Sequence, residues 1–201
     1  MGCGTSNSAD VKPNAPRNTN QTNQVNPNVQ KKPEQNNNVL SINSKPKSKM
    51  EIFIESALKK HNEYRALHKA EPLIISEDLN KIAQKYAEHI ASINTMVHSK
   101  NKYNGDSLGE NIYWCSGMLI NGADMTTSWY DEISDYRFNN PGFQSGTGHF
   151  TQVVWKGSKQ VGFGYAQASD GGYYGVANYY PAGNINTPQY FRENVIPKQY
   201  R

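Results

Sequence analysis

Cysteine is almost absent from this sequence of 201 residues, which contains only Cys3 and Cys115. Cys3 lies in a polar segment that we expect to be disordered, so we expect no disulfide bond between the two. The sequence therefore argues against a small secreted domain held together by disulfides, and it favours a reducing, intracellular environment.

The sequence also lacks long apolar runs. No stretch approaches the roughly 18–20 residues that a membrane-spanning helix needs. No apolar segment near the N-terminus has the features of a signal-peptide core. We therefore expect a protein that is neither secreted nor inserted across a bilayer.

Aromatic residues are missing from residues 1–49, which contain no Phe, Tyr or Trp but eleven Asn and five Pro. Such a composition cannot bury enough apolar surface to offset the entropy of ordering the chain. We predict that residues 1–49 form a disordered Asn/Pro-rich tail and that residues 50–201 form one folded domain.

The basic charge of the chain belongs to this tail. The tail has seven basic and two acidic side chains, whereas residues 50–201 have 14 basic and 15 acidic ones. A nearly neutral domain argues against nucleic acid as a partner. The basic tail suits attraction to an anionic membrane surface, and a merely soluble linker fits the charge equally well.

The first residues, "MGCGTS", match the N-myristoylation pattern M-G-x-x-x-[ST], with Gly2 exposed after removal of Met1 and Ser6 in the required position. Cys3 lies beside Gly2, where palmitate can be attached. One myristoyl chain binds a bilayer with an association constant of only about 10⁴ M⁻¹, so stable anchoring takes two signals. We predict acylation of Gly2 and Cys3, and a peripheral location on the cytoplasmic face of the Golgi or plasma membrane.

Three helical patterns precede three β-type runs in the folded part. We predict helices over residues 51–68, after an N-cap at Ser76, and over residues 123–138. The segment between the second and third helices is expected to consist mainly of loops. Strands are predicted in "HFTQVVW" (149–155), "KQVGFGYAQ" (159–167) and "YYGVANYYP" (173–181). This order predicts an α+β fold, a sheet covered by helices.

Four motifs resemble those of the CAP superfamily in the same order: "HNEYR" (61–65), "GENIY" (109–113), "GHFTQVVW" (148–155) and "YYPAGN" (179–184). That superfamily comprises cysteine-rich secretory proteins, antigen 5 and pathogenesis-related 1 proteins, and its module is also called the SCP domain. The resemblance implies a three-layer α-β-α sandwich with a small, mainly antiparallel central sheet. Secreted members typically contain several disulfides, so this chain is most similar to the intracellular, Golgi-associated branch.

The resemblance also implies a cleft that contains two histidines and two acidic residues, which match His98, Glu110, Glu132 and His149. Members of the family bind a divalent metal, often Zn²⁺, on the two histidines, and neutral imidazole suits that ion. Glu110 and Glu132 line the cleft and could orient the metal ligands. The four side chains could instead satisfy one another as a structural hydrogen-bonded network, because two protein ligands make a weak zinc site.

Other side chains allow less specific interpretations. Ser116 could act as a nucleophile with His98 as its base and Glu110 orienting that base, but no nucleophile-elbow motif surrounds it. Cys115 is more typical of a packed apolar residue than of a nucleophile. We interpret His61 as a capping or packing residue, and His68 and His89 as surface residues.

For function, the resemblance implies binding of acidic lipids or sterol at a membrane, together with partner proteins or self-association. The alternative is a metal-assisted hydrolase or protease that uses the same cleft. We assign no catalytic residue.

The anchor makes the first testable prediction. Gly2→Ala is expected to make the protein cytosolic, because neither acyl chain would then be attached. Cys3→Ser is expected to leave a myristoylated protein that is easily extracted, because one chain binds only marginally. Cell fractionation at physiological salt measures both outcomes. If Gly2→Ala still fractionates with membranes, the folded domain must supply the binding.

Overall fold

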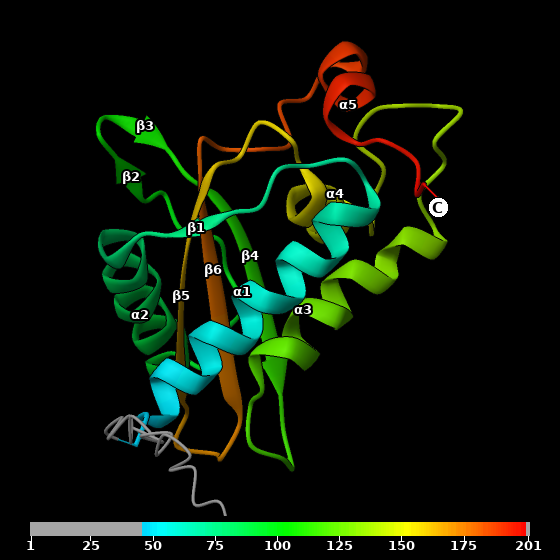
Figure 1. Cartoon of the computed structure of the whole chain (residues 1–201). Helices are drawn as coiled ribbons and strands as arrows, with labels where there is room; N and C mark the ends of the chain where they lie inside the picture. Colours follow the sequence, from blue (N-terminus) through cyan, green and yellow to red (C-terminus); the bar gives the residue numbers. More distant parts are fainter. Residues whose placement is uncertain (1–45, 200–201) are drawn as a thin grey trace, which may run out of the picture. The chain divides into compact units, whose positions relative to one another are not determined.

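A four-stranded sheet with helices on both faces forms the core of residues 46–199, the part of the chain that the computed structural model describes (Figure 1). The predicted tail and its acylation motif, including Gly2 and Cys3, lie outside the described residues, apart from positions 46–49. The α+β class and the three-layer arrangement are confirmed.

Helices and strands are mixed along the chain rather than grouped in separate blocks. The helices are α1 (Lys49–Leu67), α2 (Glu77–Ser92), α3 (Gly122–Asp131), the short 3₁₀ helix η1 (Glu132–Ser134), α4 (Gly148–Val154) and α5 (Pro188–Asn194). The strands are β1 (Ile74–Ile75), β2 (Lys102–Tyr103), β3 (Asp106–Ser107), β4 (Gly109–Cys115), β5 (Gln160–Gln167) and β6 (Tyr173–Tyr180).

The central sheet has the order β1-β5-β6-β4, with β2 and β3 forming a separate pair. β5, β6 and β4 pair antiparallel, and only the two-residue β1 runs parallel to β5. The sheet is therefore mainly antiparallel, as predicted.

Side-chain hydrogen bonds at their N-termini explain where the first two helices begin. Ser48 Oγ accepts from the backbone N–H of Glu51 at 3.2 Å, and Glu51 Oε2 accepts from the backbone N–H of Ser48 at 2.6 Å. This reciprocal capping box satisfies donors that the first turn leaves free. The predicted N-cap Ser76 likewise accepts from the backbone N–H of Leu79.

The alternating pattern of β5 separates the two faces of the sheet. Val161 and Phe163 are fully buried in the core beneath α1, α3 and α4. Gly162 and Gly164 point to the other face, where a Cβ atom would lie 2.1 Å and 2.3 Å from the backbone of α2. Glycine at these two positions therefore lets α2 approach the sheet closely.

The prediction of a strand at residues 149–155 is wrong, because Gly148–Val154 form α4. All residues from Phe150 to Val154 are buried, so the sequence shows no one-sided helical pattern. A short apolar run of this kind cannot be assigned from periodicity alone. The prediction of mainly loop between the second and third helices also missed a strand, because β4 is the edge strand of the sheet.

Two further predictions need correction. The third helix ends at Asp131, with η1 after it, rather than at residue 138. His68 is fully buried rather than on the surface, and its Nε2 lies 2.9 Å from Tyr130 Oη. Its Nδ1 lies 2.6 Å from the carbonyl oxygen of Ile196, so it connects α1 to the C-terminal segment. Burial lowers the pKa of His68 and favours the neutral imidazole.

Arg65, on the buried side of α1, is fully buried and bonds to backbone carbonyls. Its Nε donates to Glu71 at 2.8 Å, and its Nη1 donates to Val153 at 3.0 Å and to Trp155 at 2.9 Å. Its Nη2 donates to Ser158 at 3.0 Å. Burial lowers the pKa of Arg65 to about 10, so the guanidinium remains charged at neutral pH.

Replacing this guanidinium tests how much the fold depends on it. Arg65→Leu is expected to lower the free energy of unfolding by about 3–5 kcal/mol, because it leaves buried carbonyls without their donors. Arg192→Leu, at an exposed position of α5, is the control and should change it by less than about 0.5 kcal/mol. Urea denaturation measures both. Equal stability of the two variants would contradict the structural role of Arg65.

Candidate functional site

One cavity of about 260 Å³ is lined by all four residues that the family resemblance singles out, His98, Glu110, Glu132 and His149. Asn111, Phe143, Gly146, Gly148 and Asn184 complete its lining. The four side chains come from separate elements: the loop after α2, β4, η1 and α4. Their gaps along the sequence therefore contain no local ligand motif.

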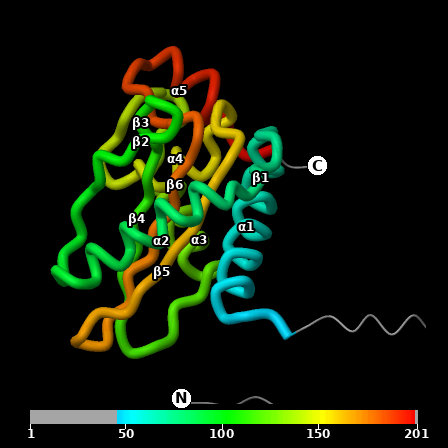
Figure 2. Tube along the Cα trace, turned by 90° about the vertical axis from the view of Figure 1, so that its left-hand side faces the viewer, coloured from blue at the N-terminus to red at the C-terminus, as the bar shows by residue number. Residues whose placement is uncertain are grey.

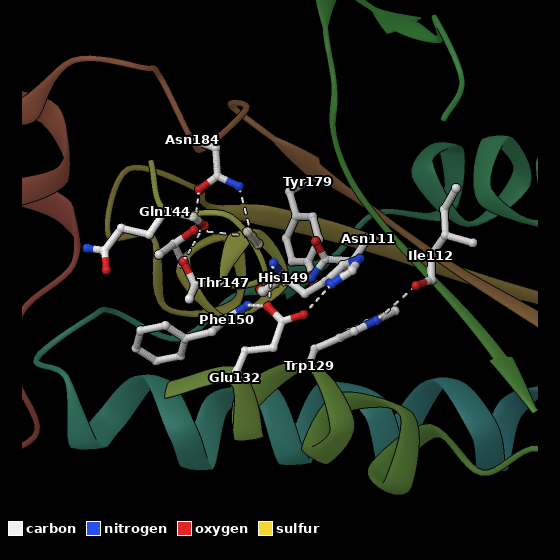
Figure 3. A network of polar contacts seen from close by, with 12 residues as sticks. Asn111, Ile112, Trp129, Glu132, Gln144, Thr147, His149, Phe150, Tyr179 and Asn184 are labelled. Carbon is white, nitrogen blue, oxygen red and sulfur yellow. Dashed lines mark hydrogen bonds and ion pairs between the residues drawn. The ribbon is translucent and has the colours of Figure 1, made fainter. Parts of the chain in front are cut away.

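Glu132 connects η1 to the N-terminus of α4 (Figure 3). Its Oε1 lies 2.6 Å from His149 Nδ1, and its Oε2 accepts from the backbone N–H groups of His149 at 2.9 Å and Phe150 at 3.1 Å. Thr147, the N-cap residue of α4, makes no capping bond with its own side chain. A carboxylate distant in sequence therefore caps this helix and orients the imidazole at the same time.

The indole of Trp129 fixes the other side of the His149 ring. The two rings stack with centroids 6.2 Å apart and planes inclined by 17°. Trp129 is 2% exposed, and its Nε1 donates to the carbonyl of Ile112 at 3.1 Å. Because Trp129 is buried and hydrogen-bonded, a rigid aromatic wall stands beside the site.

Glu110 and His98 form the second pair. His98 Nδ1 lies 3.0 Å from Glu110 Oε1, and Ser99 donates to the same carboxylate from its backbone N–H at 2.8 Å and from its hydroxyl at 2.5 Å. Asn178 Nδ2 donates to Glu110 Oε2 at 3.2 Å. Burial alone would raise the pKa of Glu110, but these hydrogen bonds outweigh burial and hold that pKa below its usual value. The bond to Glu110 in turn raises the pKa of His98.

Both imidazoles contact their carboxylate through Nδ1. A carboxylate accepts hydrogen bonds, so Nδ1 acts as the donor, and in the neutral form of such a ring Nε2 carries the lone pair. Within residues 46–199, neither Nε2 has a hydrogen-bond partner. This arrangement of carboxylate, imidazole and free Nε2 is the one that metal-binding histidines use. The same described residues contain no cluster of three or more His, Cys, Asp or Glu that could hold a metal ion.

A buried polar layer supports the site from below, and sequence analysis missed two of its members. Asn111 Nδ2 donates to the carbonyl of His149 at 3.1 Å and to Tyr179 Oη at 3.3 Å. Tyr179 Oη lies 2.7 Å from His61 Nε2, and His61 Nδ1 donates to the carbonyl of Ala57 at 2.8 Å. Burial lowers the pKa of His61 to about 3, so this histidine stays neutral and packs as predicted.

Asn184 is the third residue that sequence analysis missed. Its Nδ2 donates to the carbonyl of Gly148 at 2.8 Å, and its Oδ1 accepts from the Thr151 hydroxyl at 2.7 Å. Asn111, Tyr179 and Asn184 all lie inside the quoted motifs "GENIY" and "YYPAGN". A polar residue inside such a motif was the signal that could have found them.

The structure does not bring Ser116 to this site. Ser116 follows the end of β4 and is exposed, whereas Glu110 is the second residue of that strand. Six residues of extended chain span about 20 Å, so Ser116 cannot act on the His98–Glu110 pair as a nucleophile. Cys115 is half-buried, and burial raises the pKa of its thiol, which disfavours the thiolate.

Comparisons with known proteins agree with this fold and with these motifs. The chain is 46% identical over 151 residues to Golgi-associated plant pathogenesis-related protein 1 of Homo sapiens, which covers 75% of this chain and 97% of that protein. It is 39% identical over 147 residues to Protein PRY2 of Saccharomyces cerevisiae, which covers 72% of this chain but 41% of that protein.

None of the helices in residues 46–199 combines the length and hydrophobicity that a bilayer-spanning helix requires.

Solved structures share the fold. The crystal structure of NaASP2 with Zn²⁺ has a TM-score of 0.58 at 24% identity and covers 77% of this chain and 90% of that one. The structure of BmVAL-1 has a TM-score of 0.57 at 23% identity and covers 72% and 83% of the two chains. The family model for CAP, the cysteine-rich secretory protein family, matches residues 58–179. With a match over more than half of its length, this protein belongs to the CAP family.

Proposed function

We propose that this protein is a CAP-domain protein that is anchored to an intracellular membrane by N-terminal acylation and binds lipid or sterol there. The observation that carries the proposal is the "MGCGTS" motif on a chain that aligns with 97% of a relative named as Golgi-associated. The motif supplies the chemistry of attachment, and the relative supports the type of membrane.

The physical argument for two acyl chains is one of affinity. A myristoyl group on Gly2 would give transient binding, and a second chain on Cys3 would make it persistent. The basic side chains of the tail add at most about 1 kcal/mol each, and only those close to an anionic surface contribute. Anchoring therefore rests on acylation, and the tail charge tunes it.

We also propose that the cavity can hold a divalent metal ion such as Zn²⁺. His98 and His149 would supply the ligand nitrogens, because each keeps its Nε2 free while a carboxylate orients its Nδ1. NaASP2, a structural neighbour, was crystallised with Zn²⁺. A bound zinc ion would act as a Lewis acid toward water or a ligand oxygen, with coordination positions left open.

We favour binding over metal-assisted hydrolysis for this cavity. Both carboxylates already hold an imidazole and backbone N–H groups, so neither is free to act as a general base. Ser116 and Cys115 lie at the other end of β4 from Glu110. Zinc-dependent cleavage of a peptide or ester that is lost in a His98→Ala/His149→Ala variant would overturn this preference.

Vesicle flotation tests the membrane proposal. The doubly acylated full chain is expected to float with phosphatidylcholine vesicles at physiological salt, because two acyl chains give stable binding. The unacylated chain should require acidic lipid or sterol in the vesicles to float. Vesicles of these three compositions are compared side by side. If the acylated chain floats with none of them, the membrane proposal is wrong.

Zinc titration calorimetry tests the cavity. His98→Ala is expected to lower zinc affinity by at least about tenfold, because changes to the groups around a metal ion typically cost 10–100-fold. The His98 side chain is 66% exposed, so its removal should leave the fold intact. His89→Ala removes an exposed histidine of α2 and serves as the matched control. Equal zinc affinity in the two variants would rule out this site.

A further inference from the structure

Exposed apolar side chains gather at one end of the central sheet, the end where Tyr173 of β6 pairs with Cys115 of β4 and with Gln167 of β5. We name this group the apolar end; its members are Ile52 (55% exposed), Ile93 (46%), Trp114 (44%), Met118 (65%) and Leu119 (59%). In both views the first turn of α1, the loop after β4 and the β5–β6 turn lie together at this end (Figures 1 and 2).

The loop from Ser116 to Asn121 exposes two apolar residues directly before a buried one. Gly117 adopts a φ of +77°, which permits the chain to turn there. Ile120 is 6% exposed and belongs to the core, whereas the two residues before it point to solvent. Core packing therefore explains Ile120 but leaves Met118 and Leu119 without a folded-state role.

α1 and this loop share one surface groove. It measures about 270 Å³, and its lining includes Ile52 and Phe53 of α1, Leu119 and Ile120 of the loop, and Lys49. Ile52 and Leu119 therefore belong to one continuous apolar surface rather than to two isolated positions. Contiguous exposed apolar surface marks protein or membrane contact sites.

The point where the chain enters the domain indicates which contact this is. Residues 1–45 precede the described part, and Ser48 caps α1 one turn before Ile52. The tail of about 43 residues is predicted from its composition to be disordered, and a chain of that kind would span roughly 35–40 Å, at 5–6 Å times the square root of its length. Acyl chains at its far end would keep the apolar end near the bilayer at a high effective concentration, so even a weak contact would be populated.

We propose that the apolar end is the face that this domain lays on the lipid bilayer. The inference rests on the proposed membrane anchoring and adds to it an orientation and a set of contact residues. Trp114 suits this position, because tryptophan concentrates at the membrane–water interface.

The charged side chains at this end do not favour an electrostatic contact, so we expect the contact with the bilayer to be mainly apolar. Lys47 is paired with Glu55 at 2.6 Å, and Glu51 is held in the capping box. Asp170 accepts from the backbone N–H of Gly172 at 2.9 Å, and Asp124 lies in the first turn of α3. Lys49 adds one exposed positive charge. Basic groups do not dominate this surface, so the contact should need no anionic lipid and should resist salt.

With the apolar end on the bilayer, the His98–His149 cavity would lie away from the membrane surface. Glu110 and Cys115 lie five residues apart on β4, a distance of about 17 Å along an extended strand. The cavity would then open toward soluble partners or ions rather than toward lipid headgroups.

Quenching of tryptophan fluorescence by brominated phosphatidylcholine tests the orientation. The full chain is bound to vesicles in two ways: by its own acyl chains, and by an N-terminal hexahistidine tag on a nickel-chelating lipid. Trp114 is the natural reporter, because Trp129 and Trp155 are each 2% exposed. We expect quenching in both arms, its loss in Trp114→Phe, and the loss of most of it in Met118→Ser/Leu119→Ser.

Two controls sharpen the result. Ile74→Ser/Ile185→Ser removes two exposed apolar residues near the opposite end of the sheet and should retain wild-type quenching. Raising salt from about 0.1 M to about 1 M, which shortens the Debye length from about 10 Å to about 3 Å, should leave quenching by the tethered chain unchanged.

The two arms separate the two proposals. Quenching in the tethered arm without binding in the acylated arm would refute the acyl anchor and support the apolar end. A vesicle-bound chain whose Trp114 is not quenched would overturn the orientation, and so would a Met118→Ser/Leu119→Ser variant that is quenched like the wild type.

Discussion

The buried guanidinium of Arg65 is the constraint on which the rest of this domain depends. It holds α1 against the end of α4 and the turn that leads into β5, by donating to the backbone carbonyls of Val153, Trp155 and Ser158. α4 has seven residues, too few to be stable as an isolated helix in water. Arg65 fixes its C-terminal end and Glu132 fixes its N-terminal end, so the helix that presents His149 exists because both of its ends are held by distant residues.

A second layer carries this rigidity to the cavity. Neutral His61, Tyr179 and Asn111 form a chain of hydrogen bonds that runs from α1 through β6 and β4 to the backbone of His149. Burial raises the pKa of Tyr179 and lowers that of His61, so neither group gains a charge near neutral pH. The cavity therefore has a floor whose protonation is fixed, while the titratable pair His98–Glu110 lies at its more exposed side.

How much of this the sequence predicted depended on whether the signal was local. The helix α1, the start of α2 after the N-cap Ser76, and the strands β5 and β6 all come from signals a few positions apart, and the sequence predicted each of them close to its observed bounds, although it missed the Ser48 cap of α1. α4 was missed because burial on every side removes helical periodicity, and the buried His68 was missed because its partners lie 62 and 128 residues away. The four cavity residues came from family resemblance, since no spacing rule connects β4 with α4.

The double use of Glu132 has a consequence for how this cavity can change. Its carboxylate caps a helix and holds an imidazole, so selection or design cannot alter the His149 side without also disturbing the local fold. The His98 side is different, because His98 lies on an exposed loop and helps hold no helix. Variation in binding preference among proteins built on this plan should therefore accumulate on the loop side, while the helix side stays fixed by folding itself.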